Sequence, residues 1–599
     1  MAPEQILTMA GQAMQRGDWP SAERILHDGL TSYPGHAELL GMMAIAVFRS
    51  GRPEQALEWF RRAAESGNRA SDWANLGSAL CDFGRFEEAH EALRKALAAA
   101  PSDAFTHFCL ARALHGMGRS EEALDRIGAA IEAEPGDTGF RLLRAEIAAA
   151  LDLRELASTD IDWLLQRRIG LFELLQSASL MLQVGRFGQA LALYRSLAAS
   201  HPDQFDAWLG VCLASERAND LAGLRQALER ARSLASNPVQ AAAVEQMRGK
   251  LAFRNGGFDE ACGFFASAWA FHTDNARWKS QIGFDYCQSL DKAGRFADAL
   301  RVCGAAHALQ AAGAESNAAQ EARAGFLQML RKPAVAASGS VRVDDGRADP
   351  VFVVGFPRSG TTLLELILDS RPGLVSFDEK PYLVKTLMQY RSSGLAYPES
   401  LSMLDAPRIE RLRNAYFDQL AVDGVDPQAR PVDKNPLNWA YLPLVRALFP
   451  GAHVILALRH PLDVVLSCYM QNLRSAGNLF SSVARIAELY AEMVDYWQRL
   501  EPALDLPVLV SRYEDLVSDP EAGTRRIAEF LDLPWDAGWL DNSTHARGKA
   551  IIHTPSYAQV LEPLNTRAMG RWRNYRDLFD PAVLDVLRPA AESMGYSLD

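Results

Sequence analysis

A recurring interval constrains the fold of this chain more than any other feature. A small turn residue, a few further residues, an Ala and an apolar stretch recur every 33 or 34 residues, and the last two intervals are 37 and 38. The copies are anchored at Gly17, Gly51, Gly84, Gly118, Asp152, Gly185, Asn219, Gly256 and Gly294. An Ala stands five residues after the anchor in eight copies: Ala22, Ala56, Ala89, Ala123, Ala157, Ala190, Ala261 and Ala299. Such a period predicts a stack of small units that bury their apolar faces against one another.

Each unit resembles the tetratricopeptide (TPR) repeat, a helix–turn–helix of 34 residues. Gly suits the turn between the two helices, and the small Ala lets these helices approach closely. Stacked units form a superhelix with a concave surface. The resemblance implies that this surface binds a peptide or protein partner. The residues leave a spacer or dimerisation scaffold equally open, because repeat architecture does not name a ligand.

The repeats fade after Gly294, and the 599 residues exceed what one hydrophobic core holds. An Ala-rich stretch that we expect to be helical comes next, and then residues 332–350, which are rich in small and polar side chains and read as a linker. We predict a multidomain protein: an all-α TPR superhelix over residues 1–310, a helix and linker over 311–349, and an α/β domain with a central parallel sheet over 350–599.

The α/β domain opens with a phosphate-binding pattern. Residues 351–354 are apolar and β-branched, typical of a buried parallel strand, and a Gly-bounded loop at 355–360 leads into a helix predicted to run from Thr361 to about Asp369. Strand, loop and helix start together predict an anion site. The spacing is that of a Walker A loop, but Thr361 replaces the Lys and the cation, Arg358, lies inside the loop. This disfavours an ATP-dependent kinase.

The loop at 357–362 resembles the 5′-phosphosulfate loop of the sulfotransferase superfamily, in the Arg-bearing form similar to protein-tyrosine sulfotransferases and bacterial TPR-linked sulfotransferases. Four further segments of the domain occur in the family's order, so the resemblance covers about residues 350–575. It implies the P-loop-type fold of nucleoside kinases and the donor 3′-phosphoadenosine 5′-phosphosulfate (PAPS). The residues it assigns to the 5′-phosphosulfate are Arg358, Ser359, Gly360, Thr361 and Thr362.

Other contacts to PAPS follow from the same resemblance. The strand predicted at residues 453–458 ends at Arg459, and Arg459 and Ser467 stand where the family holds the 3′-phosphate. Gln471 replaces a basic residue that tyrosylprotein enzymes can carry there. A strand at 508–511 precedes Tyr513, which the family places near the nucleotide. A segment that closes over PAPS supplies the remaining predicted contacts: Ser556, Gln559, Asn565 and Arg571.

Sulfuryl transfer needs a base for the acceptor hydroxyl, cations for the leaving oxygen and alignment of the reacting atoms. The resemblance assigns four catalytic residues: Arg358 and Lys434 as cations, Glu379 as base and Ser556 beside the bridging oxygen. Asp378 is a rival base, and either acid could instead cap a helix starting near Pro381. Lys434 could instead be an ordinary surface lysine. Structural or solvent-facing roles are expected for the histidines near these motifs: His460, His545 and His553.

Composition excludes several other classes. The formal net charge of −12 disfavours a nucleic-acid binder, and no uncharged apolar run is long enough for a membrane span. The seven Cys are scattered, which predicts reduced thiols in the cytoplasm and no metal site, and no secretory signal is visible. We therefore predict a cytoplasmic PAPS-dependent sulfotransferase that acts, without a metal, on a hydroxyl or phenol of a peptide or protein, a carbohydrate or a small molecule. The alternatives are a TPR scaffold that binds PAPS without turnover and a P-loop kinase.

Overall fold

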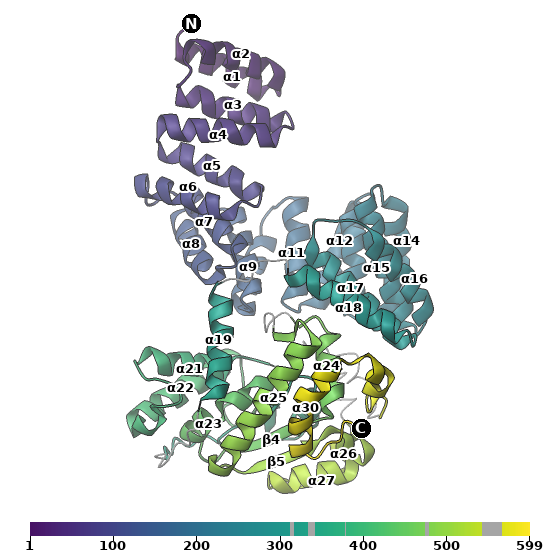
Figure 1. The fold of residues 1–599 in the computed structure, drawn as a ribbon. Helices are drawn as coiled ribbons and strands as arrows, with labels where there is room; N and C mark the ends of the chain where they lie inside the picture. Colours follow the sequence, from purple (N-terminus) through teal and green to yellow (C-terminus); the bar gives the residue numbers. More distant parts are fainter. Residues whose placement is uncertain (312–316, 333–341, 378, 474–478, 542–565) are drawn as a thin grey trace. The chain divides into compact units, whose positions relative to one another are not determined.

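The computed structural model describes residues 1–311, 317–332, 342–377, 379–473, 479–541 and 566–599. The chain divides into two compact units, residues 1–247 and 248–599, and each is considered by itself. The first unit is entirely helical in Figure 1, and the second combines helices with a sheet.

Paired antiparallel helices build the first unit. They are α1 (Pro3–Gln15), α2 (Trp19–Ser32), α3 (Ala37–Arg49), α4 (Pro53–Gly67), α5 (Ala70–Asp82), α6 (Phe86–Ala99), α7 (Ala104–Gly116), α8 (Ser120–Ala133), α9 (Thr138–Ala150), α10 (Arg154–Leu165), α11 (Leu171–Gln183), α12 (Phe187–Ser200), α13 (Phe205–Arg217) and α14 (Leu221–Leu234). α15 (Pro238–Arg254) crosses into the second unit, where α16 (Phe258–Ala270), α17 (Ala276–Lys292), α18 (Phe296–Ala311) and α19 (Asn317–Arg331) follow.

The repeat anchors predicted from the sequence lie in the turns within these helix pairs. All nine have positive φ, from 57° at Asp152 to 87° at Gly185. Asp152 and Asn219 replace Gly in two of the turns, and Asp and Asn are the residues that tolerate this conformation best after Gly. The eight Ala residues five positions later have no exposed surface. The helix–turn–helix prediction is therefore confirmed.

The second unit contains a parallel sheet with strand order β2-β3-β1-β4-β5. The strands are β1 (Val351–Gly355), β2 (Leu374–Ser376), β3 (Arg430–Lys434), β4 (His453–Leu458) and β5 (Val508–Arg512). In register, Val353 of the central strand lies opposite Lys434 of β3 and Ile455 of β4. Because all five strands are parallel, their carboxyl ends meet at one edge, where open α/β sheets bind ligands.

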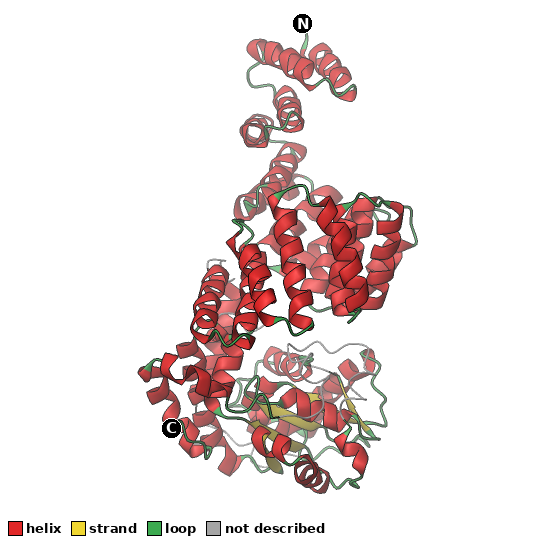
Figure 2. Cartoon of the chain, turned by 90° about the vertical axis from the view of Figure 1, so that its right-hand side faces the viewer, coloured by secondary structure: helices red, strands yellow, loops and turns green. Residues whose placement is uncertain are grey.

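Helices cover both faces of the sheet, as Figure 2 shows for the yellow strands among red helices. They are α20 (Thr361–Asp369), α21 (Tyr382–Ser392), α22 (Ala406–Val422), α23 (Leu442–Leu448), α24 (Pro461–Tyr469), α25 (Val483–Leu500), α26 (Tyr513–Ser518), α27 (Pro520–Phe530) and α30 (Pro581–Ser593), with a 3-10 segment η6 (Arg571–Leu578). Successive side chains of β1 point to opposite faces of the sheet. Val351 and Val353 pack with α20 and α27 on one face, whereas Phe352 and Val354 pack with α25 and α30 on the other.

The last repeat hairpin shares the second of these cores. Phe284 of α17, Val302 of α18 and Leu330 of α19 are buried in the same apolar cluster as Phe352 and Val354 of β1. The hairpin and the sheet thus belong to one compact unit that begins at residue 248. The division at residues 311–349 drawn from the sequence stays a prediction.

This shared core predicts where the chain can be cut. A fragment of residues 248–599 should fold and unfold cooperatively, whereas a fragment of residues 347–599 should aggregate or melt at a much lower temperature, since it exposes the apolar surface that α17–α19 cover. Thermal unfolding followed by circular dichroism compares the two. Equal melting temperatures would contradict the prediction.

Candidate active site

Each strand of the sheet delivers one predicted site residue at its carboxyl end. Arg358 follows β1, Glu379 follows β2, Lys434 ends β3, Arg459 follows β4 and Tyr513 follows β5. Read across the sheet, the order is Glu379, Lys434, Arg358, Arg459 and Tyr513. Residues that are up to 155 positions apart in sequence therefore line a single edge.

The loop after β1 is tightly built. A Cβ on Gly355 would lie 2.5 Å from the Ala457 carbonyl oxygen, and one on Gly360 would lie 2.8 Å from the Tyr513 ring, so both positions require Gly. The Ser359 hydroxyl donates to the Phe356 carbonyl oxygen at 2.7 Å and braces the turn.

Helix α20 begins at the end of this loop. Its first two residues, Thr361 and Thr362, are buried, and the first N–H groups of a helix have no intrahelical acceptor. This geometry suits an anion, because those donors and the helix dipole point toward the loop.

Arg358 connects the loop after β1 to helix α24, which follows β4. Its backbone is left-handed, with φ 73°, which is rare for a residue with a side chain. Its Nε donates to Ser467 Oγ at 3.0 Å, so the structure brings the predicted 5′-phosphosulfate cation next to a predicted 3′-phosphate contact. Burial lowers the pKa of Arg358 to about 10, and the charges of Arg459 and Arg571 add to the lowering. The guanidinium remains charged at neutral pH.

Arg459 is only 8% exposed, so its charge is largely removed from solvent. Its guanidinium lies 4.9 Å from the centre of the Tyr513 ring, and its Nη1 donates to the Arg358 carbonyl oxygen at 3.3 Å. Its Nη2 donates to the Ala568 carbonyl oxygen. The Nε–H is buried and has no acceptor among the residues that the structure describes. Buried donors are normally paired, so this orphaned N–H fits a bound anion such as a phosphate.

Lys434 is fully buried, which makes the surface-lysine alternative wrong. Its Nζ lies 2.9 Å from Glu379 Oε1 and 3.1 Å from Glu365 Oε2. Glu365 comes from α20, is buried itself and accepts from the Ser376 hydroxyl at 3.0 Å. Two carboxylates compensate the desolvated ammonium, as a buried charge requires. Sequence reasoning missed Glu365, although an acid inside the apolar run of α20 was a readable signal.

Glu379 faces outward, since 46% of its side chain is exposed. The N-cap of α21, Pro381, has no side-chain capping hydrogen bond, and Glu379 is engaged by Lys434 instead. The carboxylate is therefore held on one side by a buried cation and is open to solvent on the other, which an acceptor hydroxyl could approach. Asp378, the rival base, lies outside the described residues.

A second buried acid, Asp433, supports the strand that carries Lys434. It accepts hydrogen bonds from Tyr416 Oη at 2.8 Å and Asn438 Nδ2 at 2.9 Å. Burial raises the pKa of Asp433 to about 7. These contacts fix the end of β3 and hence the position of Lys434.

Part of the C-terminal segment belongs to the described residues, and this part lies at the same edge of the sheet. Arg571 Nε donates to Asp291 Oδ1 at 3.0 Å, and the backbone N–H of Trp572 donates to Asp463 Oδ1 at 2.8 Å. His460 stacks on the Trp572 ring with centroids 4.7 Å apart, a structural contact. The other predicted residues of this segment lie outside the described residues: Ser556, Gln559, Asn565, His545 and His553.

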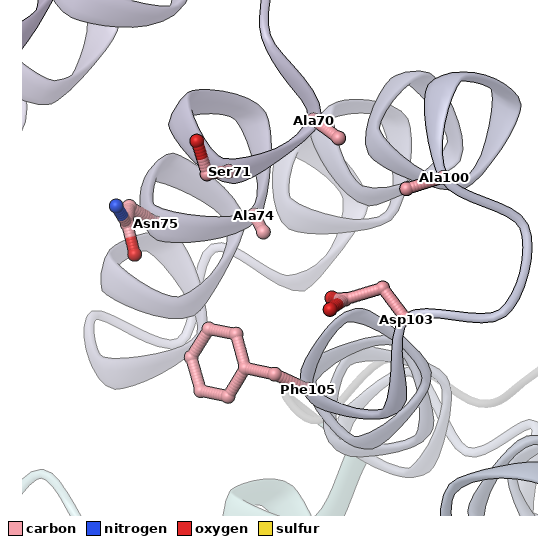
Figure 3. Close-up of a pocket in the computed structure, with 7 residues that line it drawn as sticks. All are labelled: Ala70, Ser71, Ala74, Asn75, Ala100, Asp103 and Phe105. Atoms are coloured by element: carbon pink, nitrogen blue, oxygen red, sulfur yellow. The ribbon is translucent and has the colours of Figure 1, made fainter. Parts of the chain in front are cut away.

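Away from this edge, the repeats contain a hollow. The hollow, of about 390 Å³, lies between α5 and α7 of the repeats (Figure 3) and is lined by Ala70, Ser71, Ala74, Asn75, Ala100, Asp103 and Phe105. All seven Cys are buried and free. Among the described residues no three His, Cys, Asp or Glu side chains gather as metal ligands, and no described helix is long and apolar enough to cross a membrane.

A parallel sheet with a Gly-bounded loop and buried cations at its carboxyl edge is the arrangement of a P-loop-type α/β domain. Comparison with protein families makes this more specific. Residues 350–537 match the sulfotransferase family, and residues 13–80, 81–147 and 175–241 match tetratricopeptide repeats. The chain is thus similar to tetratricopeptide repeats in its first part and to the sulfotransferase family over residues 350–537.

Individual relatives are more distant. An uncharacterised protein of Aquifex aeolicus is 30% identical over 253 residues, 40% of this chain and 32% of that protein. Protein-tyrosine sulfotransferase A of Caenorhabditis elegans is 29% identical over 269 residues, 43% of this chain and 70% of that protein. The solved sulfotransferase domain of the Synechococcus PCC 7002 olefin synthase aligns with a TM-score of 0.33 and 21% identity, over 44% of this chain and 100% of that domain. The chain therefore spans about a third of the Aquifex protein.

The buried ion cluster makes a direct prediction for stability. Lys434→Met should destabilise the second unit by about 3–5 kcal/mol, because Glu365 loses its cation while still buried. Adding Glu365→Gln should recover part of the loss. Urea unfolding of the full chain measures both, with Lys385→Met on the exposed face of α21 as the matched control. A K434M variant as stable as K385M would contradict the ion cluster.

Proposed function

We propose that the protein transfers a sulfuryl group from PAPS to a hydroxyl or phenol. One observation carries the proposal: Arg358, Ser467 and Arg459 converge at a phosphate loop without a Walker Lys, beside the Lys434–Glu379 pair. A site for two separated phosphate groups with an adjacent carboxylate matches a donor of this kind better than a triphosphate, which needs the Lys and a metal.

The two sides of the site would divide the work. On the β4–β5 side, the orphaned Nε–H of Arg459 and the hydroxyl of Ser467 would hold the 3′-phosphate, with Tyr513 stacked on Arg459. At the centre, Arg358 and the loop residues Ser359, Gly360, Thr361 and Thr362 would hold the 5′-phosphosulfate. Arg571, Ser556, Gln559 and Asn565 are proposed to complete the nucleotide contacts.

The chemistry would take place toward β2 and β3. Glu379 accepts the proton of the acceptor hydroxyl, the acceptor oxygen forms a bond to sulfur, and the bond from sulfur to the bridging oxygen breaks. Adenosine 3′,5′-bisphosphate (PAP) leaves with the electron pair of that bond. Lys434 and Arg358 stabilise the negative charge on the departing oxygen, and Ser556 is proposed to lie beside it. No metal takes part in the proposed step.

We further propose that the acceptor is a peptide or protein, with a tyrosine phenol the first to test. The relatives named protein-tyrosine sulfotransferases and the repeats, which suit extended chains, support this choice. A carbohydrate or small-molecule acceptor remains the alternative. We propose a cytoplasmic location, since the seven buried thiols are free.

Nucleotide binding tests the class of the donor. The full chain should bind PAP with micromolar affinity by calorimetry, and Arg459→Met should weaken binding at least tenfold, because the variant loses a charge-assisted contact to a phosphate. Arg525→Met, which alters an exposed arginine on α27, is the matched control and should bind as the wild type does. Binding of ATP–Mg²⁺ with indifference to PAP would refute the donor and favour the kinase.

The rate of sulfuryl transfer tests whether Glu379 is the base. Glu379→Gln should lower the rate of sulfuryl transfer from PAPS by about 10²–10⁴-fold while PAP affinity stays near the wild-type value, since the amide cannot take the acceptor proton. The assay follows labelled sulfate onto tyrosine peptides, oligosaccharides and phenols, with the exposed Glu410→Gln on α22 as control. An E379Q variant with full activity would exclude Glu379 and leave Asp378. PAP binding without any turnover in the wild type would favour the scaffold.

A further inference from the structure

The strongest unassigned feature lies where the last repeat meets the edge of the sheet. Asp291, near the end of α17, is buried, yet sequence reasoning gave it no role. Its Oδ1 accepts hydrogen bonds from Arg571 Nε at 3.0 Å and from Tyr575 Oη at 2.6 Å. Both donors belong to η6, so a carboxylate of the repeat array holds two side chains that lie about 280 residues later in the chain.

A second carboxylate holds the backbone on either side of Arg571. Asp463 of α24 accepts from the backbone N–H groups of Gly570 and Trp572, both at 2.8 Å. Asp463 thus fixes the backbone on either side of Arg571. Asp291 is left to fix the direction of the guanidinium itself, and Met470 Sδ accepts from its Nη2 at 2.9 Å.

The end of α24 lies between the phosphate loop and the repeat hairpin. On the loop side, Ser467 accepts from Arg358, and the Cys468 thiol donates to the Pro357 carbonyl oxygen at 3.3 Å. These two contacts tie the last turn of α24 to the loop that follows β1.

On the repeat side, the next residue of α24 meets α18. The Tyr469 carbonyl oxygen accepts from the Cys303 thiol at 3.1 Å and lies 2.8 Å from His307 Nε2. The Tyr469 ring stacks on the His307 ring with centroids 4.7 Å apart. The hairpin α17–α18 therefore packs directly behind the helix that carries Ser467.

We propose that Asp291 is a positioning residue that directs Arg571 toward the bound nucleotide, so that the last repeat hairpin is part of the nucleotide site. The inference rests on the proposed PAPS-dependent function. Asp291 is buried, whereas 25% of the Arg571 side chain is exposed. Such an Arg–Asp pair fixes the direction of a planar guanidinium. The chain just before Arg571 contacts the site, because the Ala568 carbonyl oxygen accepts from Arg459 Nη2. The charge of Arg571 also lowers the pKa of Arg358.

A double-mutant cycle on the full chain tests whether Asp291 acts through Arg571. PAP affinity is measured by calorimetry for the wild type, Asp291→Asn, Arg571→Gln and the double variant. We expect each single variant to bind about tenfold more weakly and the double variant to bind no more weakly than Arg571→Gln alone. A D291N variant with wild-type affinity, or additive losses in the double variant, would overturn the proposal.

A neighbouring acid of the same hairpin provides the control. Asp298 of α18 pairs with Arg295 and Arg301 at the surface, and Asp298→Asn should bind PAP as the wild type does. Hydrogen exchange without nucleotide gives a readout independent of function. Exchange in the peptide of residues 566–578 should accelerate in D291N and stay unchanged in D298N. Unchanged exchange in D291N would refute the positioning role of Asp291.

Two further outcomes are decisive. If D291N does not fold, Asp291→Glu takes its place: it keeps the charge but shifts the carboxylate by one methylene, so a positioning role predicts weaker PAP binding at an unchanged melting temperature. Wild-type affinity in D291E would overturn the proposal. A wild-type chain that does not bind PAP would refute the proposed function and this inference together, whereas a wild-type chain that binds alongside an unaffected D291N would refute the inference alone.

Discussion

A stack of helical hairpins always leaves an apolar face uncovered at its end, and this chain covers the last one with the helices of its own α/β domain. Phe284 and Val302 of the last hairpin are buried with Phe352 of the central strand, so one core serves both architectures. Apolar burial is not directional, but it places polar groups such as Asp291 and His307 against the sheet domain, where they find specific partners. The last repeat hairpin is therefore joined to the sheet by packing and hydrogen bonds, not only by the chain that links them.

Buried charges impose the second constraint. Lys434 has no solvent contact, so the Glu365 and Glu379 carboxylates must stay within about 3 Å of its Nζ to offset desolvation. Glu365 comes from the helix after the phosphate loop and Glu379 from the segment after β2. The ion cluster consequently ties three neighbouring strand ends together and leaves Glu379 as its exposed member.

Much of this arrangement could be predicted from periodicity and local patterns. The nine repeat turns, β1, β4, β5 and the extent of α20 all follow from signals that lie within a few residues of each other. The three-residue strand β2 carried too short a pattern to read. Asp291, Glu365 and Asp463 were missed because their partners are distant in sequence, and a single sequence does not show which charges meet after folding.

The order of residues across the sheet suggests why the site is asymmetric. Toward β4 and β5, Arg459 is buried against Tyr513, and its Nε–H has no acceptor in the described part of the chain, which favours an anion held firmly away from water. Toward β2, Glu379 is nearly half exposed, which favours a second molecule that arrives from solvent. Arg358, in its strained backbone conformation, lies between the two sides. A group transferred between a buried donor and an exposed acceptor would have to pass the Arg358 guanidinium. The strained backbone of Arg358 is understandable if the fold maintains the position of this guanidinium.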